Sequence, residues 1–374
     1  MPEVAYRVFF GDRSATREQL EAIEEITVEQ EMDLMWEARM KRPVCLDAQG
    51  RWQGQDEDFM RSFARVRVEI KVGKAAFVPL IDGPVTGFDS QKSNEPGRSS
   101  ITLTVRDDSV FLDRNEAVAR FDDLSDSDVA RQLLGDVEQI AEVDVDETPP
   151  PSRNLPPAVV QRGTAMQLLR RMARRQGMHA YVLPGSAQGR SIGLFKRLST
   201  APSDLPPLVL LGRARNVEQV NASNDDERPA TVQASSVNVD DKDVVSSTSR
   251  FDDLDRLGSE FTFDQEDRTA KRLAAPTEGS AVDLDRRVAG EAERDSFAFQ
   301  ISGRAIPDCY AGVLRPYLVV KVDGLHGKSS GNFLIRRVTH TLTRSTYTQS
   351  FTMTRNARSP RVGKAVMNAI DKIF

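Results

Sequence analysis

Alternating apolar and polar residues predict β-structure near both ends of the chain. Residues 347–354 alternate strictly, with Tyr347, Phe351 and Met353 on one face and threonine and serine side chains on the other. A half-buried antiparallel strand has this period of two. Similar runs predict strands at residues 4–10, 62–72, 77–88, 101–105, 317–322 and 332–343, and one or two strands within residues 23–39. Residues 17–25 fit a helix or a strand, and residues 41–58 are predicted to be a loop.

The spacing of apolar residues becomes helical after residue 115. Ser125 or Asp126 can cap a helix whose apolar residues recur at positions 129, 133, 137 and 140. Asp122, Asp123 and Asp128 add carboxylates, but the glycine and the terminal glutamate of a calcium loop are missing. These acidic residues therefore indicate the positive end of a helix rather than a metal site.

A second helix is predicted after a proline-rich linker at residues 149–157. Thr164 and Gln167 form a capping-box pair, and Gly177 stands where a left-handed residue ends a helix. The inward face consists of Leu168, Leu169, Met172 and Ala173. Residues 179–183 and 192–195 then predict a small hairpin.

Two further stretches follow in the last third of the chain. Residues 246–295 mix acidic and basic residues, which is typical of a solvated face, and helices are expected at residues 266–273 and 284–293. Residues 363–374 form an amphipathic stretch with its apolar residues on one side. Those residues are Val366, Met367, Ile370 and Phe374.

A faint internal repeat relates residues 83–108 to residues 212–241. Both segments read as a strand, a serine-asparagine-acid turn and an alternating strand that ends in two aspartates, although their spacings differ by three residues. The repeat favours two similar β-units.

Composition is that of a globular protein with two or three domains. The 374 residues are 39% hydrophobic and 29% charged, with a net charge of -5, which argues against a surface that binds nucleic acid throughout. The two cysteines, Cys45 and Cys309, are too few for a disulfide framework, and their spacing is not that of a metal site. No apolar run is long enough to span a bilayer, and no signal peptide is recognisable. We therefore expect synthesis and folding in a cytoplasm.

No motif for catalysis or cofactor binding is found. Residues 324–329 hold a glycine, a lysine and a serine, but the loop is two residues too short to wrap a phosphate and lies between strands. A Ser-x-x-Lys signature does not occur. His179, His326 and His340 have no metal-ligand spacing, and His340 is expected to make a structural polar contact. We predict no catalytic residue, no cofactor and no metal.

The most basic local feature lies on the second predicted helix. Arginines occupy positions 170, 171, 174 and 175. A solvated helix face explains them, and the functional alternative is a contact of Arg174 and Arg175 with a partner or a second subunit. Nucleic acid is disfavoured because no aromatic residues interleave with the arginines. The stretch at 363–374 packs on its own β-unit or docks on a neighbour, since a short amphipathic helix needs an apolar surface.

Motifs near the C-terminus resemble a known family. Gly303-x-Ala305-x-Pro307 precedes a strand, Asp323-Gly324 and a loop; Gly331-x-Phe-Leu-Ile-x-x-Val-x-His340-x-Leu and Tyr347-x-x-x-Phe-x-Met follow. This order resembles the late-control-D family, the baseplate hub proteins of contractile phage tails, whose module also forms the front half of VgrG-type secretion spikes. The predicted helix and hairpin at 164–195 resemble the same family.

The resemblance implies a mainly β fold with an α+β insertion. Two similar, tube-like β-barrel domains at residues 1–115 and 206–356 would flank a helical and hairpin insert at 116–205, with the charged interruption at 246–295 and the tail at 357–374. It also implies a homotrimeric hub, without enzymatic activity, that joins a hexameric tail tube to a trimeric spike and contacts baseplate wedge proteins. VgrG-type proteins continue into their spike, so a separate spike polypeptide is expected here. The alternatives are a β-barrel cell-wall hydrolase of a tail or secretion apparatus and a monomeric ligand-binding protein.

Overall fold

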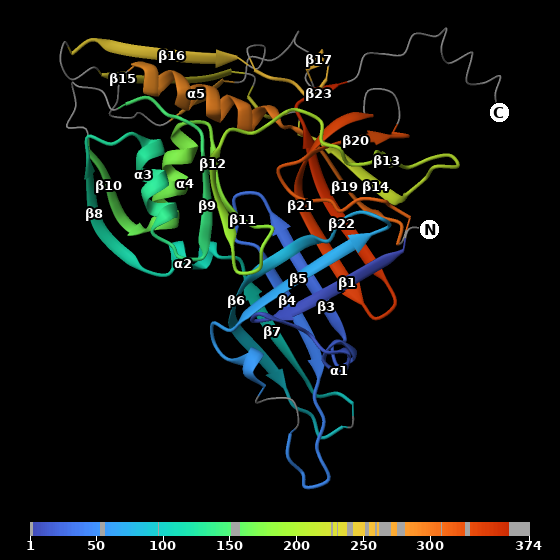
Figure 1. Cartoon of the computed structure of the whole chain (residues 1–374). Coiled ribbons are helices and arrows are strands. Elements are labelled where there is room, and N and C mark those ends of the chain that lie inside the picture. The colour runs from blue at the N-terminus through green and yellow to red at the C-terminus, as the bar shows by residue number, and fades with distance from the viewer. Residues whose placement is uncertain are drawn as a thin grey trace, which may run out of the picture.

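The protein is built around one large curled β-sheet (Figure 1). The computed structural model describes residues 3–52, 57–95, 97–150, 158–225, 227–229, 231–237, 242–250, 254–258, 260–261, 271–274, 281–307, 309–325 and 330–358. Strands dominate these residues and helices are few, so the predicted mainly β class is confirmed.

Thirteen strands of the described residues form the large sheet. The N-terminal strands are β1 (Val4–Phe10), β2 (Arg13–Ser14), β3 (Glu25–Glu31), β4 (Glu37–Pro43), β5 (Arg65–Val72), β6 (Val78–Gln91) and β7 (Ser100–Arg106). The C-terminal strands are β13 (Leu208–Val209), β14 (Val217–Asn224), β19 (Phe299–Ala305), β20 (Val319–Asp323), β21 (Gly331–Thr343) and β22 (Tyr347–Arg355). Their order is β14-β19-β22-β21-β3-β4-β7-β6-β5-β1-β2, with β20 beside β21 and β13 beside β20.

The pairing of β3 with β21 joins the two ends of the chain. Thr343 to Arg337 lie antiparallel to Glu25 to Glu31, so the two β-rich parts share one continuous sheet. Each part keeps its own hydrophobic core, one around Val66, Ile70 and Leu103 and the other around Ile335, Phe351 and Met353. The sequence does not predict this continuity, because each strand pattern is also compatible with a separate sheet.

In the sequence, an α+β insert lies between the two β-rich parts. Its elements are α2 (Ser109–Asp113), β8 (Glu116–Asp122), α3 (Asp126–Gly135), β9 (Ile140–Val145), β10 (Ala158–Thr164), α4 (Ala165–Arg175), β11 (His179–Pro184) and β12 (Ser191–Lys196). The capping box of Thr164 and Gln167 and the antiparallel β11–β12 hairpin are confirmed. Gly177 follows α4 with a φ of 65°, in the left-handed region, as predicted.

One expectation for the insert is wrong, and two strands were missed. The first helix is capped by Ser125 as predicted, but it ends at Gly135, and Ile140 instead begins β9. β9 pairs in parallel with β12, a tertiary contact that overrides the helical spacing of residues 137 and 140. Strands β8 and β10, which pair antiparallel, were not predicted. Residues 151–157 of the expected linker lie outside the described residues.

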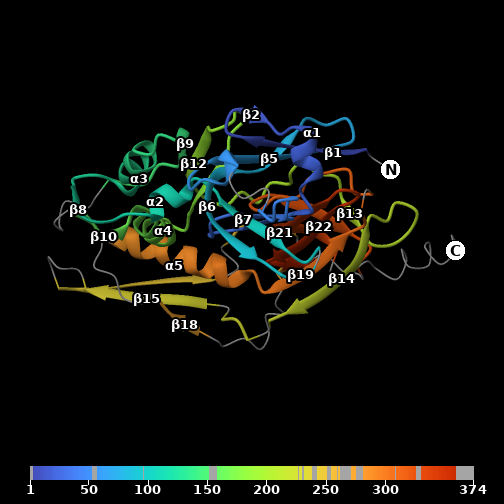
Figure 2. The ribbon, with the colours of Figure 1, turned by 90° about the horizontal axis from the view of Figure 1, so that it is seen from below.

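Helix α5 and strands β15 and β16 form a smaller layer next to the insert. Helix α5 (Ala281–Ser296) confirms the predicted helix at 284–293 and packs against β15 (Thr231–Val237) and β16 (Val244–Arg250). Figure 2 shows α5 running from the insert toward β19. The helix expected at 266–273 is wrong where it is described, because β18 (Lys271–Leu273) pairs in parallel with β15. β17 (Glu260–Phe261) pairs with β23 (Ala357–Arg358).

The internal repeat is not reproduced by the strand pairing. β6 and β7 form an antiparallel hairpin, whereas β14 pairs with β19 and β15 belongs to another sheet. The similar sequence patterns therefore reflect strand and turn chemistry and not a repeated hairpin. The undecided segment at 17–25 contains α1 (Arg17–Glu21), which Thr16 caps, and the predicted loop ends in the short 3-10 helix η1 (Asp58–Met60).

Candidate assembly site

The turn between β11 and β12 docks on the first β-rich part through a buried arginine. The side chain of Arg67 on β5 is 2% exposed, and its guanidinium donates to the carbonyl oxygens of residues 185–187 over distances of 2.9 to 3.3 Å. It also pairs with Glu69 at 2.6 Å and with Asp82 at 2.8 Å. A guanidinium presents donors in a planar fork, which suits several acceptors at once. Arg67 thus fastens the insert to the sheet.

Arg65 extends this network. Its guanidinium donates to Asp82 at 2.7 Å and to both carboxylate oxygens of Asp108, at 2.9 and 2.7 Å. The hydroxyl of Ser191 donates to Asp108 at 2.6 Å, and the backbone N–H of Gly189 donates to Asp82 at 2.9 Å. Burial raises the pKa of Asp108 even though Arg65 opposes the shift. Asp82 and Asp108 therefore join two arginines of the sheet to two residues of the insert.

Strand alternation alone misassigns this charged face. Charged residues 65, 67 and 69 alternate with valine and isoleucine along β5, a pattern that places them in water. The β11–β12 turn covers the face instead, so both faces of β5 are buried. The three charged residues on one face of β5 were the only sign in the sequence of this buried network. A strand with one face in water has the same pattern.

A second joint is aromatic and connects three parts of the chain. The ring of Tyr181 on β11 stacks on that of Tyr317, with centroids 3.7 Å apart and planes inclined by 9°. The Tyr317 hydroxyl accepts from the backbone N–H of Asp33 at 2.7 Å, and the Asp33 carboxylate lies 2.7 Å from Nδ1 of His179. Asp33 and Tyr317 have φ values of 62° and 68°. Such strain in residues other than glycine persists only where surrounding contacts fix the backbone.

Helices α4 and α5 form the third joint. A Cβ atom added to Gly290 would lie 2.6 Å from the Cα atom of Gly177, so the two helices approach at bare backbone. Arg174 beside this contact donates to Glu291 at 2.8 Å. Burial would raise the pKa of Glu291, but the hydrogen bond from Arg174 and nearby arginine charges outweigh it and lower that pKa.

The two arginines predicted as candidate contacts both have partners within the chain. The side chain of Arg174 is 61% exposed and forms an ion pair with Glu291. Arg175 forms an ion pair with Asp126, whose side chain is 2% exposed. Nε of Arg175 lies 2.7 Å from Oδ2 of Asp126. Their contact with another subunit stays a prediction. The other candidates, Val366, Met367, Ile370 and Phe374, lie outside the described residues.

His340 makes the structural contact that was predicted. Its side chain is fully buried; Nδ1 lies 2.9 Å from the Tyr347 hydroxyl and Nε2 3.3 Å from Oε1 of Gln30. The Gln30 amide nitrogen donates to the Leu80 carbonyl at 2.7 Å. Every group in this series of hydrogen bonds has a partner when the Tyr347 hydroxyl donates to Nδ1 of His340 and Nε2 donates to Oε1 of Gln30. Burial lowers the pKa of His340 to about 3. A neutral histidine therefore bridges the two halves of the sheet.

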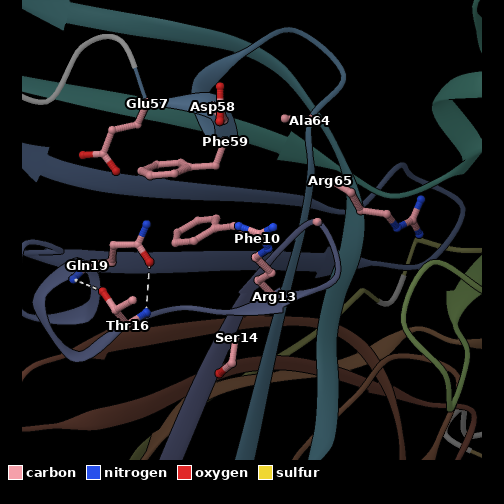
Figure 3. Close-up of a pocket in the computed structure, with 11 residues that line it drawn as sticks. Phe10, Arg13, Ser14, Thr16, Gln19, Glu57, Asp58, Phe59, Ala64 and Arg65 are labelled. Atoms are coloured by element: carbon pink, nitrogen blue, oxygen red, sulfur yellow. Dashed lines mark hydrogen bonds between the residues drawn. The ribbon is translucent and has the colours of Figure 1, made fainter.

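A groove opens at the β2 end of the large sheet. Its floor is a stack of Phe10 on Phe59, with ring centroids 4.0 Å apart, and its volume is about 630 Å³ (Figure 3). Glu57 and Asp58 form one wall, and residues 13–19 form the other. Hydrogen bonds between Thr16 and Gln19, drawn in Figure 3, fix the second wall as the cap of α1. The groove combines an apolar floor with charged rims, as protein interfaces do.

The described residues hold no group of three or more histidine, cysteine or acidic side chains placed to bind a metal. The side chains of Asp82 and Asp108 share Arg65 and are fully buried, so this carboxylate pair is closed to a substrate. β20 and β21 pair antiparallel, which confirms the predicted hairpin; residues 326–329 of its loop, His326 among them, lie outside the described residues. Within the described ranges, no helix has the length and hydrophobicity of a membrane span.

The architecture matches solved structures of phage tail proteins. A 43 kDa tail protein of prophage MuSo2 from Shewanella oneidensis superposes with a TM-score of 0.67, over 94% of this chain and 98% of that chain, at 13% identity. The chain has the fold of these tail proteins. A tail protein from Neisseria meningitidis gives a TM-score of 0.65 over 94% and 96% of the two chains, at 14% identity.

A third structure extends the likeness to secretion systems. It is an Escherichia coli component of the type VI secretion system, described as structurally similar to the T4 tail proteins gp27 and gp5. It superposes with a TM-score of 0.55 at 11% identity, over 95% of this chain and 77% of that chain. No protein-family model and no curated protein sequence matches this chain. The likeness therefore concerns the fold, and function has to be argued from surfaces.

Proposed function

We propose that this chain is a structural hub of a contractile tail baseplate, a homotrimeric symmetry adapter between a hexameric tail tube and a trimeric spike. The observation that carries the proposal is the end-to-end likeness to the Shewanella tail protein, which spans 94% of this chain and 98% of that chain. The C-terminal motifs around His340 support the same family.

The large sheet suits a ring. Its main strand path ends in β14 on one side and in β2 on the other, and these ends carry different residues. A contact between unlike ends is heterologous, and heterologous contacts close into cyclic rings when the rotation fits. Three subunits with two β-rich parts each would offer six similar units to a sixfold tube and three to a spike. A separate spike polypeptide and baseplate wedge proteins complete the proposed set of partners.

The insert is held rigidly enough for such a role. The Arg67 network, the Tyr181–Tyr317 stack and the α4–α5 contact fix it against the sheet and against α5. A protein that converts one symmetry into another acts through its shape, so its parts must keep their relative positions. The protein would be made in a bacterial cytoplasm and incorporated into a virion tail or a tail-like particle.

The test is reconstitution with a tail tube protein and a spike protein. We expect a particle with three copies of this chain and one spike trimer, visible by mass measurement and as a threefold ring by electron microscopy. A chain that stays monomeric with both partners present would refute the proposal. Release of peptidoglycan fragments by the isolated chain, abolished by replacing one acidic residue, would favour the hydrolase alternative.

A further inference from the structure

Strand β8 is a free edge at the outside of the insert. In the part of the chain that the structure describes, β8 pairs with β10 on one side and with no strand on the other. Figures 1 and 2 both place β8 at the rim of the insert, away from the large sheet. An edge strand leaves backbone N–H and C=O groups without partners in its sheet, so it can pair with a strand of another chain.

Common protections of a sheet edge are missing from β8. Its seven residues include neither proline nor lysine, and its register with β10 runs from Glu116 to Asp122 without a bulge. By contrast, β2 at one end of the large sheet is only two residues long. Val118 in the middle of β8 is 85% exposed. A strand added beside β8 would remove apolar surface of this side chain from water.

The charges of β8 are complementary to those of a second β8 strand. Glu116, Val118 and Arg120 are all exposed and share one face, because side chains alternate along a strand. When two β8 strands lie antiparallel with Val118 opposite Val118, Glu116 of each strand lies opposite Arg120 of the other. Opposite charges directly across a strand pair are stabilising. On the other face Ala117 lies opposite Ala119, so no large side chain separates the strands at this centre.

The existing contacts of these side chains do not compete with this pairing. Among the described residues, none forms an ion pair with Glu116. Nε of Arg120 pairs with Asp122, with side chains 62% and 56% exposed, which leaves the two terminal nitrogens of the guanidinium for Glu116 of a second copy. The other cation on this face of the ribbon is Arg162 of β10, and β8 lies between it and an added strand.

We propose that two copies of this chain associate through their β8 strands, antiparallel and centred on Val118, to form a four-stranded sheet in the order β10-β8-β8-β10. The same strand contacts itself, so the contact is isologous and twofold. It covers an edge that would otherwise accept strands unspecifically. One strand pair is smaller than a standard interface of about 1,200–2,000 Å², so the dimer is expected to be weak. The contact concerns the free chain and does not depend on the hub function, because β8 is not part of the large sheet.

Disulfide trapping tests the centre of the contact in the full chain. Directly opposed residues of antiparallel strands have Cα atoms about 4.5–5.5 Å apart, a distance that a disulfide spans. Val118→Cys, with Cys45→Ser and Cys309→Ser, should therefore give a disulfide-linked dimer under mild oxidation. The matched control is Val160→Cys in the same background. Val160 is also exposed, but β10 and its copy would lie three strand spacings apart, on the order of 14 Å, so this variant should stay monomeric.

Charge reversal tests the register of the two strands. Glu116→Arg places arginine opposite Arg120 and should reduce the yield of the Val118→Cys dimer by on the order of 10-fold. Arg120→Glu in the same chain should recover most of that yield, because the opposed charges then differ again. All three positions are exposed, so each variant should keep the wild-type thermal midpoint.

Two results would overturn the β8 contact. One is a Val118→Cys chain that cross-links no better than Val160→Cys. The other is a dimer yield that stays the same after Glu116→Arg. Neither result would affect the proposed hub function, which reconstitution with a tube protein and a spike protein tests separately.

Discussion

The insert is fastened to its neighbours by two sets of ion pairs that differ in burial. On the sheet side, Arg67 and Asp82 have side-chain exposures of 2% and 0%, and three backbone carbonyls complete the arginine's hydrogen bonds. On the α5 side, Arg174 pairs with Glu291 while 61% of its own side chain faces water. The same residue types thus make a fully buried network in one place and, in the other, a pair of an exposed arginine with a buried glutamate whose side chain is 8% exposed.

Burial makes these two contacts unequal in energy. A guanidinium in water is solvated whether or not a carboxylate is near, so an exposed pair contributes about 0–1 kcal/mol. A guanidinium buried with its carboxylates is different, because loss of one partner leaves the others desolvated. The sheet side should therefore hold the insert in place, and the α5 side should tolerate change.

The largest expected effect is that of Arg67→Met. Methionine fills most of the space but leaves the carbonyls of residues 185–187 without donors and removes one cation from Glu69 and Asp82. We expect a loss of about 3–5 kcal/mol in the free energy of unfolding, measured by chemical denaturation. Hydrogen exchange should also rise in the β11–β12 turn. A loss below 1 kcal/mol would end the distinction between the two sides.

His340 extends the comparison to a buried polar group without a charge. Its pKa is lowered from 6.5 to about 3 in the folded protein by burial and by the nearby charge of Arg315. As the pH falls below 6.5, the unfolded chain takes up a proton that the folded protein refuses, so stability decreases until about pH 3. At pH 4 the loss should reach about 3 kcal/mol, at 1.36 kcal/mol per pKa unit.

His340→Gln isolates this effect, because glutamine can hydrogen bond but does not titrate. The stability of the wild type relative to this variant should fall between pH 6.5 and pH 4, as followed by denaturation at each pH. A difference that stays constant over that range would show that His340 titrates normally and is accessible to water.

Arg175→Met should have an intermediate effect. Arg175 is partly exposed, but its partner Asp126 is buried. Among the described side chains, the Gln176 amide, at 2.8 Å, would remain as a donor to Asp126 after the loss of Arg175. We expect a loss of about 1–3 kcal/mol, typical of a buried acceptor that loses a partner. Asp126→Asn in the same background should recover part of it, since the amide needs no counter-charge. No recovery would mean that packing, and not charge, sets the cost.

The smallest effect is expected for Arg174→Met. Glu291 would still have Arg294 at 3.6 Å and Arg272 at 3.8 Å. The free energy of unfolding should change by less than about 1 kcal/mol in the denaturation assay used for Arg67→Met. A larger loss would place Arg174 among the residues that fix the insert.

Elements with strong local signals were predictable. The strict alternation at 347–354 is strand β22, the Thr164–Gln167 capping box opens α4, and residues 284–293 lie within α5. Each depends on backbone periodicity or on a hydrogen bond between residues close in sequence, which neighbouring residues determine by themselves. The helix expected to reach Ile140 was wrong, because a parallel pairing with β12 decides that segment.

The candidate surfaces depended on the tertiary structure. Arg67 and Asp82 belong to adjacent strands, but the turn that buries them comes more than a hundred residues later. Phe10 and Phe59, whose rings stack on the floor of the groove, come from β1 and η1, which only the tertiary structure brings together. Sequence alone determined the mainly β class, the capped helices and the structural role of His340. The tertiary structure decided which charges are buried and which surfaces remain exposed, because burial depends on segments that are distant in sequence.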